Sequence, residues 1–444
     1  MKKLITLIIV LALSLALTSA ALADVPAPGG PFNSAFRVQN LETTAAKCSY
    51  VFYDSTGTAR YTSGTANVNP GDSLYVYVPD LTTVDPGSYS AVVSCDRKVA
   101  AVANFSDADS GASHSGISDP GTTWYAPGIY DNYYNFYSDI VAQNAGANPV
   151  DITVEIFEPG NATPVYSNTQ TGVPGFASAT FEQEGLAELA NNQFYSAKIT
   201  GTGNIAPIVN IYGRAGFDNQ LYSYNPFKSG STTAYAPVIM NNFYGYFTAL
   251  VIQNMGSATA NVTVSYTNGD TSNVNIAPGA ASTLLTMNEL PAGNILYGAT
   301  IESTNAQPIV VLVNESNLYN RAASYSGFSA GSTEVRAPIV MKRYYAYNSS
   351  VTCQNVGTAA TTMTINYASG ASGPTTSPNI PIGGTHLFYQ LTDPNLSAAP
   401  PNYISSATIT AGQPIVCVVN QDRNEAPQVT QVMDLLAAYN GIAP

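Results

Sequence analysis

Side chains suited to acid–base or metal chemistry are scarce in this sequence. It has 444 residues but only two histidines, and its four cysteines show no Cys-x-x-Cys spacing. His386 is alone in an apolar stretch and His114 lies among serine and glycine, so neither has a catalytic partner close in sequence. A zinc site needs clustered His and Cys ligands. We therefore predict no metal and no cofactor.

One short motif matches a catalytic nucleophile. Gly327–Gly331 reads Gly-Phe-Ser-Ala-Gly, which would make Ser329 the nucleophile of a hydrolase. That motif needs a strand-to-helix turn, with an acid and a histidine downstream. Here it precedes Ser332–Arg336, which we interpret as a linker, and the previous copy of the repeat described below has Lys228 in place of Ser329. We predict no catalytic residue and no enzyme activity; a Ser329 hydrolase is the alternative.

Asp107–Gly111 is the best candidate for a calcium loop. Its sequence, Asp-Ala-Asp-Ser-Gly, alternates oxygen ligands on a tight turn. The glutamate that closes an EF-hand loop is absent. We interpret the segment as an ordinary turn.

The first 23 residues have the pattern of a signal peptide. Lys2 and Lys3 precede an apolar run from Leu4 to Leu17, and Ala21-Leu22-Ala23 supplies small residues for cleavage before Asp24. A retained membrane anchor is the alternative, but the run is short for a span. We expect a secreted protein, extracellular or at the cell surface, with no membrane insertion after cleavage.

The composition narrows the class of protein further. There are 15 basic and 28 acidic residues, a net charge of −13, so we predict no nucleic-acid partner. Thirty Tyr, 35 Gly and 28 Pro beside 10% charged residues indicate many short strands and turns.

The chain after the leader is built from four copies of one repeat. A Gln-Asn pair that ends an apolar stretch marks each copy, at 39–40, 143–144, 253–254 and 354–355. Ala-Pro lies 17 residues before the pair in three copies, at 126–127, 236–237 and 337–338, and Pro-Ile-Val recurs late in the last three. We predict a signal peptide at 1–23 and repeats at 24–121, 122–231, 232–332 and 333–444.

Within each copy the hydrophobic period is two. After the marker pair, Cys48, Tyr50 and Phe52 alternate with more polar residues, and the other copies show the same alternation. This pattern predicts strands with one buried face. About seven strands in about 105 residues indicate a two-sheet sandwich. The predicted fold is all-β, with four tandem seven-stranded sandwich domains in a linear array.

These copies resemble the tandem immunoglobulin-like β-sandwich repeats of secreted bacterial surface and filament proteins. The resemblance rests on the Gln-Asn-x-Gly turns at 143–146, 253–256 and 354–357, on Tyr-Ser/Gly-Ala strands such as Tyr89–Ala91, and on the Pro-Ile-Val strands. It covers residues 25–444 and implies the fold, not one activity. Antibody domains pack a core tryptophan on a disulfide, whereas Trp124, the one tryptophan, lies in an expected linker.

The four cysteines fall in the first and last copies, as Cys48 and Cys95, and Cys353 and Cys417. Four cysteines allow three pairings. We predict disulfides within each copy, because two whole domains separate the pairs and exported proteins meet oxidising conditions. The alternative is that some are small buried hydrophobic residues.

An aromatic cluster lies between Ala-Pro and Gln-Asn in the last three copies. Tyrosine pairs a large ring with a polar tip and suits interfaces. We predict that the clusters pack one domain onto the next; binding of sugar rings or of other subunits is the alternative. The predicted interface residues are Tyr133, Tyr134, Phe136, Phe243, Tyr244, Tyr246, Tyr344, Tyr345 and Tyr347.

The two ends of the chain bear on assembly. The first copy has only 12 residues from Ala27 to Gln39 and lacks the aromatic cluster, while the last copy ends near Asn440, where an internal linker would begin. We predict self-association, with the C-terminal end of one subunit on the N-terminal domain of the next, which gives a filament or layer. The expected function is a structural protein of the cell exterior; the alternative is a monomeric adhesin or carbohydrate-binding protein with a glycan or host-surface ligand.

Overall fold

The computed structural model describes residues 7–13, 30–107, 110–214, 216–217, 220–317, 321–423 and 436–444. Of the predicted signal peptide, only Leu7–Leu13 lies in this range, as strand β1. Ala108 and Asp109 of the candidate calcium loop lie outside it. The chain divides into two compact units: residues 1–158 with 163–228, and residues 159–162 with 229–444.

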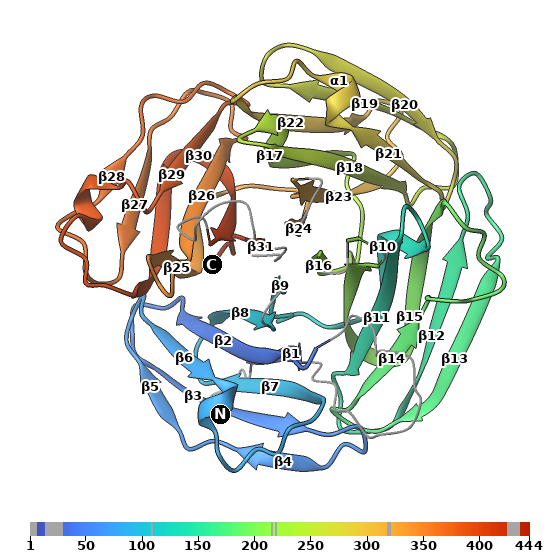
Figure 1. The fold of residues 1–444 in the computed structure, drawn as a ribbon, viewed down its shortest axis with the longest axis horizontal. Helices are drawn as coiled ribbons and strands as arrows, with labels where there is room; N and C mark the ends of the chain where they lie inside the picture. Colours follow the sequence, from blue (N-terminus) through green and yellow to red (C-terminus); the bar gives the residue numbers. More distant parts are fainter. Residues whose placement is uncertain are drawn as a thin grey trace, which may run out of the picture. The chain divides into compact units, whose positions relative to one another are not determined.

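The first unit begins with a two-sheet sandwich, which we call repeat 1 (Figure 1). One sheet has the order β1-β7-β3-β4, with β5 also paired to β3, and the other the order β6-β2-β8-β9. The bounds are β1 Leu7–Leu13, β2 Asn33–Asn40, β3 Ala46–Tyr53, β4 Ala59–Thr62, β5 Ala66–Val68, β6 Ser73–Tyr77, β7 Tyr89–Cys95, β8 Val99–Ser106 and β9 Gly111–Ser115, with a 3-10 turn at Val78–Asp80.

Repeat 2 completes the first unit as one sheet of seven strands. Its order is β13-β12-β15-β11-β14, and β10 and β16 also pair with β15. The long strand β15 therefore belongs to both layers of the repeat. The bounds are β10 Gly121–Asp131, β11 Phe136–Asn144, β12 Val150–Phe157, β13 Tyr166–Val173, β14 Ser178–Glu182, β15 Gln193–Gly213 and β16 Leu221–Tyr224.

The second unit holds repeats 3 and 4, with eight and seven strands. Repeat 3 has the order β20-β19-β22-β17-β18-β23-β24 with β21 on β18, and repeat 4 has the order β28-β27-β30-β26-β29 with β25 and β31 on β30. Repeat 3 contains β17 Thr233–Phe243, β18 Tyr246–Asn254, β19 Ala260–Tyr266, β20 Thr271–Ile276, β21 Ala281–Leu285, α1 Thr286–Glu289, β22 Leu296–Ser303, β23 Ile309–Ser316 and β24 Ala322–Ser326. Repeat 4 contains β25 Ser332–Lys342, β26 Asn348–Asn355, β27 Met363–Tyr367, β28 Thr375–Thr376, β29 Thr385–Tyr389, a 3-10 turn Pro394–Leu396, β30 Tyr403–Asp422 and β31 Leu436–Asn440.

The protein is therefore almost entirely β, as the period-two pattern predicts. Along β3 and β12, fully buried residues alternate with more exposed ones. The sheets differ in size, so seven strands is not a constant number for the copies. Repeats 2 and 4 have fewer strands because β15 and β30 each run through both layers, while repeats 1 and 3 use two separate strands there. Repeat 1 has one strand more than repeat 3, because β4 and β5 both pair with β3.

The segments expected to be linkers are strands instead. Ala126, Ala236 and Ala337 of the Ala-Pro pairs are fully buried within β10, β17 and β25, and Ser332–Arg336 opens β25. Trp124 is buried on β10, where its indole N–H donates to the carbonyl of Ile205 at 3.1 Å. Proline is tolerated here because each strand has a register shift directly after its Ala-Pro alanine.

Each marker asparagine closes the loop that follows its strand. Asn254 donates from Nδ2 to the carbonyls of Ala258 and Ile276, both at 2.8 Å, and accepts from the N–H of Gly256 at 2.8 Å. Asn40, Asn144 and Asn355 make matching sets of bonds. One side chain thus satisfies three backbone groups that would otherwise be buried unpaired.

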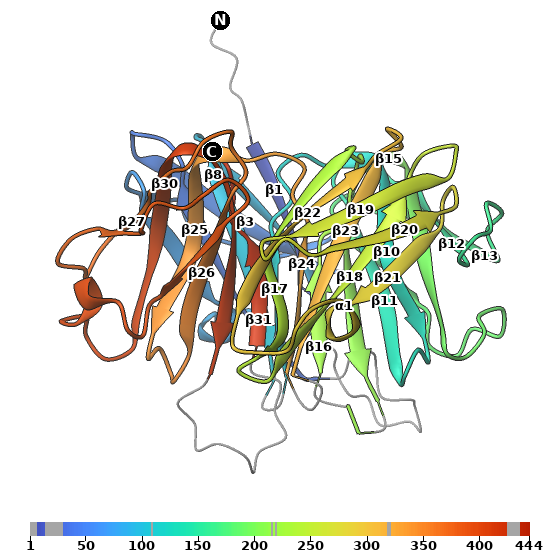
Figure 2. The ribbon, with the colours of Figure 1, turned by 90° about the horizontal axis from the view of Figure 1, so that it is seen from above.

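Both predicted disulfides are present. Cys48 on β3 lies directly opposite Cys95 on β7, and Cys353 on β26 lies opposite Cys417 on β30. Within the second unit, β24 and β31 lie side by side (Figure 2). Asn440 hydrogen-bonds both backbone groups of Ser326. Asn225 bonds Ser115 in the same way within the first unit.

Candidate functional site

Three tight hairpins place a tyrosine in solvent. They join β10 to β11, β17 to β18 and β25 to β26, and their tips are residues 132–135, 242–245 and 343–346. At each tip the third residue, Tyr134, Tyr244 or Tyr345, has 67, 73 or 67% of its surface exposed. We call these three residues the tip tyrosines.

The tip tyrosines have an unfavourable backbone. Their φ angles are 52°, 50° and 49°, in the left-handed region that favours glycine and asparagine. This conformation costs roughly 1–2 kcal/mol for a residue with a Cβ atom. A bulky exposed residue held in a strained conformation at the same place in three copies points to a contact outside the repeat.

Each tip is also fixed in place. The tip ring packs edge-on against the preceding aromatic ring, with centroids 4.8 Å apart for Tyr133–Tyr134 and 4.9 Å for Phe243–Tyr244 and Tyr344–Tyr345. The backbone N–H of Tyr244 donates to Asn294 at 2.8 Å, and that of Tyr345 to Asn402 at 3.0 Å. A preorganised aromatic ring loses little conformational freedom when it binds.

The other predicted interface residues have different surroundings. Tyr133 stacks on Tyr130 and packs edge-on against Phe194, and burial raises the pKa of its hydroxyl. Phe136 packs against the rings of Phe217 and Tyr222 within its own repeat. Phe243 packs on the core of repeat 3, while Tyr344 and Tyr347 exchange backbone hydrogen bonds across their turn.

Tyr246 reaches from repeat 3 to repeat 4. Its hydroxyl donates to the carboxylate of Asp422 at 3.3 Å and accepts from Arg321 at 3.0 Å. Arg321 also pairs with Asp422 at 2.5 Å. Desolvation raises the pKa of Asp422, against the pull of Arg321. Next to this cluster Glu315 is fully buried; its carboxylate accepts from Asn420 at 2.7 Å, and burial raises its pKa to about 8.

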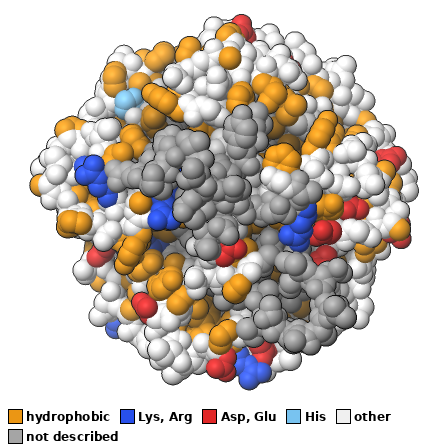
Figure 3. Space-filling view, in the orientation of Figure 1, with side chains coloured by type: hydrophobic (Ala, Val, Ile, Leu, Met, Phe, Trp, Pro, Cys, Tyr) orange, Lys and Arg blue, Asp and Glu red, His pale blue; other side chains and the backbone are white. Residues whose placement is uncertain are grey.

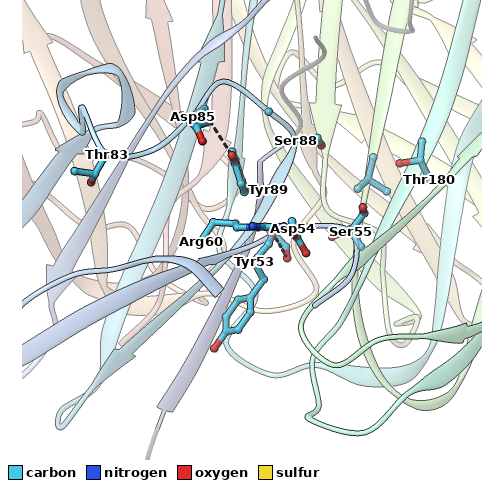
Figure 4. A pocket seen from close by; sticks show the side chains of 13 residues that line it. Tyr53, Asp54, Ser55, Arg60, Thr83, Asp85, Ser88, Tyr89 and Thr180 are labelled. Atoms are coloured by element: carbon cyan, nitrogen blue, oxygen red, sulfur yellow. Dashed lines mark hydrogen bonds and ion pairs between the residues drawn. The ribbon is translucent and has the colours of Figure 1, made fainter. Parts of the chain in front are cut away.

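A pocket of about 650 Å³ lies between repeats 1 and 2 of the first unit (Figure 4). Tyr53, Asp54, Arg60 and Tyr89 line one side, and Thr180 of repeat 2 lies opposite. Partial desolvation disfavours the charge on Asp54, but hydrogen bonds from neighbouring groups, including Arg60 at 2.5 Å, lower its pKa to about 2. The pocket thus combines an ion pair with aromatic rings.

The candidates for catalysis are not brought together. His386 lies on β29 with its ring 4.5 Å from that of Phe388, and burial lowers its pKa. Ser329 follows β24 and precedes β25, which is not a strand-to-helix turn. Asp107 accepts hydrogen bonds from the backbone N–H and hydroxyl of Ser110, as expected of a turn. In the part of the chain that the structure describes, no group of three His, Cys, Asp or Glu residues could hold a metal ion.

The sequence predicts the aromatic segments but not which ring is exposed. The signal was the turn chemistry: Asn135, Gly245 and Ala346 directly follow the tip tyrosines and are also left-handed. Two consecutive left-handed residues define a tight hairpin turn. The pocket has no sequence signal, because its residues come from distant segments.

The face of the molecule seen in Figure 3 has few charged side chains, scattered among hydrophobic and uncharged polar ones. The two disulfides indicate an oxidising environment such as the cell exterior. None of the helices in the described ranges is both long and apolar enough to cross a bilayer.

Comparisons with known proteins give little. No protein-family model matches the chain, and no curated protein matches it. Among solved structures, Thermotoga maritima 1070 is similar over 24% of this chain and 95% of its own, at 10% identity and a TM-score of 0.22. An anti-sigma factor domain-containing protein is similar over 63% of this chain and 78% of its own, at 11% identity and a TM-score of 0.12. Streptomyces avermitilis α-L-rhamnosidase complexed with L-rhamnose is similar over 85% of this chain and 55% of its own, at 9% identity and a TM-score of 0.14. These likenesses are too weak to carry an argument.

Proposed function

We propose that this protein is a secreted, non-enzymatic structural protein whose copies associate head to tail into an extracellular filament or surface layer. The immunoglobulin-like repeats of bacterial surface proteins remain the resemblance behind this proposal. The observation that carries it is the set of three preorganised, exposed tip tyrosines. Tyrosine is enriched at protein interfaces because it supplies a large contact area and one hydrogen-bonding group.

The distribution of the tips supports an unequal contact between copies. Repeats 2, 3 and 4 each have a tip, while in repeat 1 the chain from Ala27 to Gln39 is five residues shorter than the matching stretch. When a surface on one subunit binds a different surface on the next, each end of the assembly still has one unused binding surface. Further subunits can therefore add, and the assembly grows into an open chain unless it closes into a ring.

The test is negative-stain electron microscopy of the chain from Asp24 to Pro444 with its disulfides intact. We expect fibres or sheets for the unmodified chain. The triple variant Tyr134→Asn, Tyr244→Asn, Tyr345→Asn should give single particles, with a Tm equal to or above that of the parent, because asparagine tolerates the left-handed region.

The matched control is Tyr77→Asn, which changes a tyrosine on β6 with 37% exposure outside the tips. This variant should assemble like the parent. Single particles of the parent at every concentration, or polymers of the triple variant, would contradict the proposal.

Carbohydrate binding is the second candidate, and the pocket of the first unit favours it. Tyr53, whose ring stacks on Phe176, and Tyr89 line this pocket, and the Asp54–Arg60 pair offers groups that hydrogen-bond hydroxyls. Binding to a glycan array that is lost in Tyr89→Ala and kept in the tip variant would support this function. Unchanged binding in Tyr89→Ala would exclude the pocket as the site.

A further inference from the structure

The strand that pairs with β7 in repeat 1 differs from the strand at the equivalent position in the other repeats. In repeats 2, 3 and 4 this position is occupied by the strand that contains Ala-Pro. Ala126 pairs with Ala197, Ala236 with Ala299 and Ala337 with Ala407. In repeat 1 the matching alanine is Ala91, and β1 from the predicted leader pairs with this strand, with Leu11 opposite Ala91.

β1 has a different backbone register from the Ala-Pro strands. Each Ala-Pro strand has a shift directly after its alanine, as between Ala126 and Ile129, so that two residues stand where a regular strand has one. β1 runs without a shift from Leu7 to Leu13. It therefore lacks the extra residue that the other repeats have at this point.

In the other repeats that extra residue is bound by a buried tyrosine. The hydroxyl of Tyr325 donates to the carbonyl of Val238 at 2.8 Å and accepts from its N–H at 3.1 Å. Tyr439 does the same with Ile339 at 2.6 and 3.0 Å. Tyr224 does so with Gly128 at 3.2 and 3.4 Å.

Repeat 1 has His114 at the position of these tyrosines. His114 is 3% exposed, and neither ring nitrogen has a hydrogen-bond partner among the described residues. Burial lowers its pKa to about 4, so at neutral pH the ring offers one donor and one acceptor. A buried polar group left unpaired costs about 1–3 kcal/mol. The imidazole is shorter than a phenol and its two nitrogens point apart, so this histidine offers the backbone of the neighbouring strand one hydrogen bond rather than the two that each tyrosine makes.

The sequence contains one matching segment. Ala27-Pro28-Gly29 repeats the Ala126-Pro127-Gly128 of repeat 2. We propose that, in the chain without residues 1–23, the segment 24–29 replaces β1 beside β7, with Ala27 opposite Ala91 and the backbone of Gly29 bound by His114. This inference rests on the proposed secretion, since the leader must be removed.

The length of the chain permits this exchange. Phe32 and Phe136 both lie seven residues before the Gln of their marker pair, and Phe32 is buried against Phe105. Ala126 is ten residues before Phe136, whereas Ala27 is five before Phe32. Five extended residues span about 17 Å, about the length of the five strand residues from Ala126 to Asp131. With five residues fewer than repeat 2, the proposed strand leaves no length for a hairpin like those that carry the tips in repeats 2, 3 and 4.

The first experiment is a cross-link in the chain 24–444 carrying Ala27→Cys and Ala91→Cys. Directly opposed cysteines form disulfides in this protein, as at Cys48–Cys95. We expect the introduced cysteines to join within one chain, seen by mass spectrometry of non-reduced peptides. The control Val25→Cys with Ala91→Cys is two residues out of register and should not join.

Two other results of the cross-linking experiment would contradict the proposal. A cross-link between two chains on a non-reducing gel would place a second copy in the site and overturn the proposal as stated. Folded protein with no cross-link would also overturn it. If the exported protein keeps residues 1–23 by N-terminal sequencing, the proposed secretion with cleavage fails, while the cross-link in chain 24–444 still reports on the strand position.

A second measurement does not depend on new cysteines. In chain 24–444, His114→Tyr should have a higher Tm than His114→Phe, because only tyrosine restores both hydrogen bonds. In chain 30–444 the two variants should have the same Tm. Equal values in chain 24–444 would overturn the proposal.

Discussion

At the scale of single residues, the marker asparagines are the most informative positions. Three of them lie in the Gln-Asn-x-Gly turns noted in the sequence, and the bonds of Asn254 to Ala258, Ile276 and Gly256 show how this side chain holds such a turn. Local hydrogen bonding of this kind is readable from sequence, because asparagine binds its own backbone two residues on. The exposure of the tip tyrosines was not readable, because it depends on which neighbours cover each ring.

Asn254→Ala should destabilise the second unit by about 2–3 kcal/mol, because three backbone groups lose their partner and each bond contributes about 1 kcal/mol. The urea midpoint of unfolding measures this. Asn273→Ala on the exposed side of β20 is the control, with an expected change within about 0.5 kcal/mol. Equal effects of the two changes would show that the marker is not structural.

Strands were largely predictable at the scale of elements. The alternation of buried and exposed residues identified β3, β12 and β19, and the predicted strand at Tyr89–Ala91 forms the start of β7. The continuity of β15 was not predicted, because Gly201-Thr202-Gly203 interrupts the apolar pattern between its two halves. Burial of the Ala-Pro strands was also missed. Proline and glycine signal a turn locally, whereas a register shift in a paired strand satisfies them equally well.

The disulfides act on whole repeats. Cys353→Ala with Cys417→Ala releases a loop of 64 residues and should lower stability by about 4 kcal/mol in the chain-entropy model. Thermal unfolding followed by limited proteolysis should show earlier cleavage in repeat 4 and unchanged cleavage in repeat 1. Early cleavage of repeat 1 as well would mean that the repeats do not respond separately.

At the scale of the molecule, two buried acids make stability depend on pH. Asp139 on β11 is buried and accepts from Asn210 at 2.8 Å; burial raises its pKa to about 7, as it raises that of Glu315 to about 8. Between the unfolded pKa near 4 and these values, the folded state holds protons that the unfolded state has lost. Stability must therefore fall as the pH rises through this window.

Asp139→Asn and Glu315→Gln remove the titrating group and keep its shape. Each should raise the Tm at pH 8.5 and flatten the fall in Tm between pH 4.5 and 8.5, by at most a few kcal/mol per group. Glu188→Gln, at an exposed site, is the control. A variant whose Tm follows the parent at every pH would show that the buried acid is not the cause.

The long strand β15 has a consequence for synthesis. It pairs with β10, β11, β12 and β16, so repeat 2 cannot close either layer until residues 193–213 have left the ribosome. Until then, some 70 residues that form strands have unpaired backbone edges. Chains with such unpaired edges are prone to aggregate. Repeat 1 has separate strands β7 and β8 in its two sheets, so it can complete one layer before the other has been synthesised. Production of this protein should therefore be limited by the emergence of one strand.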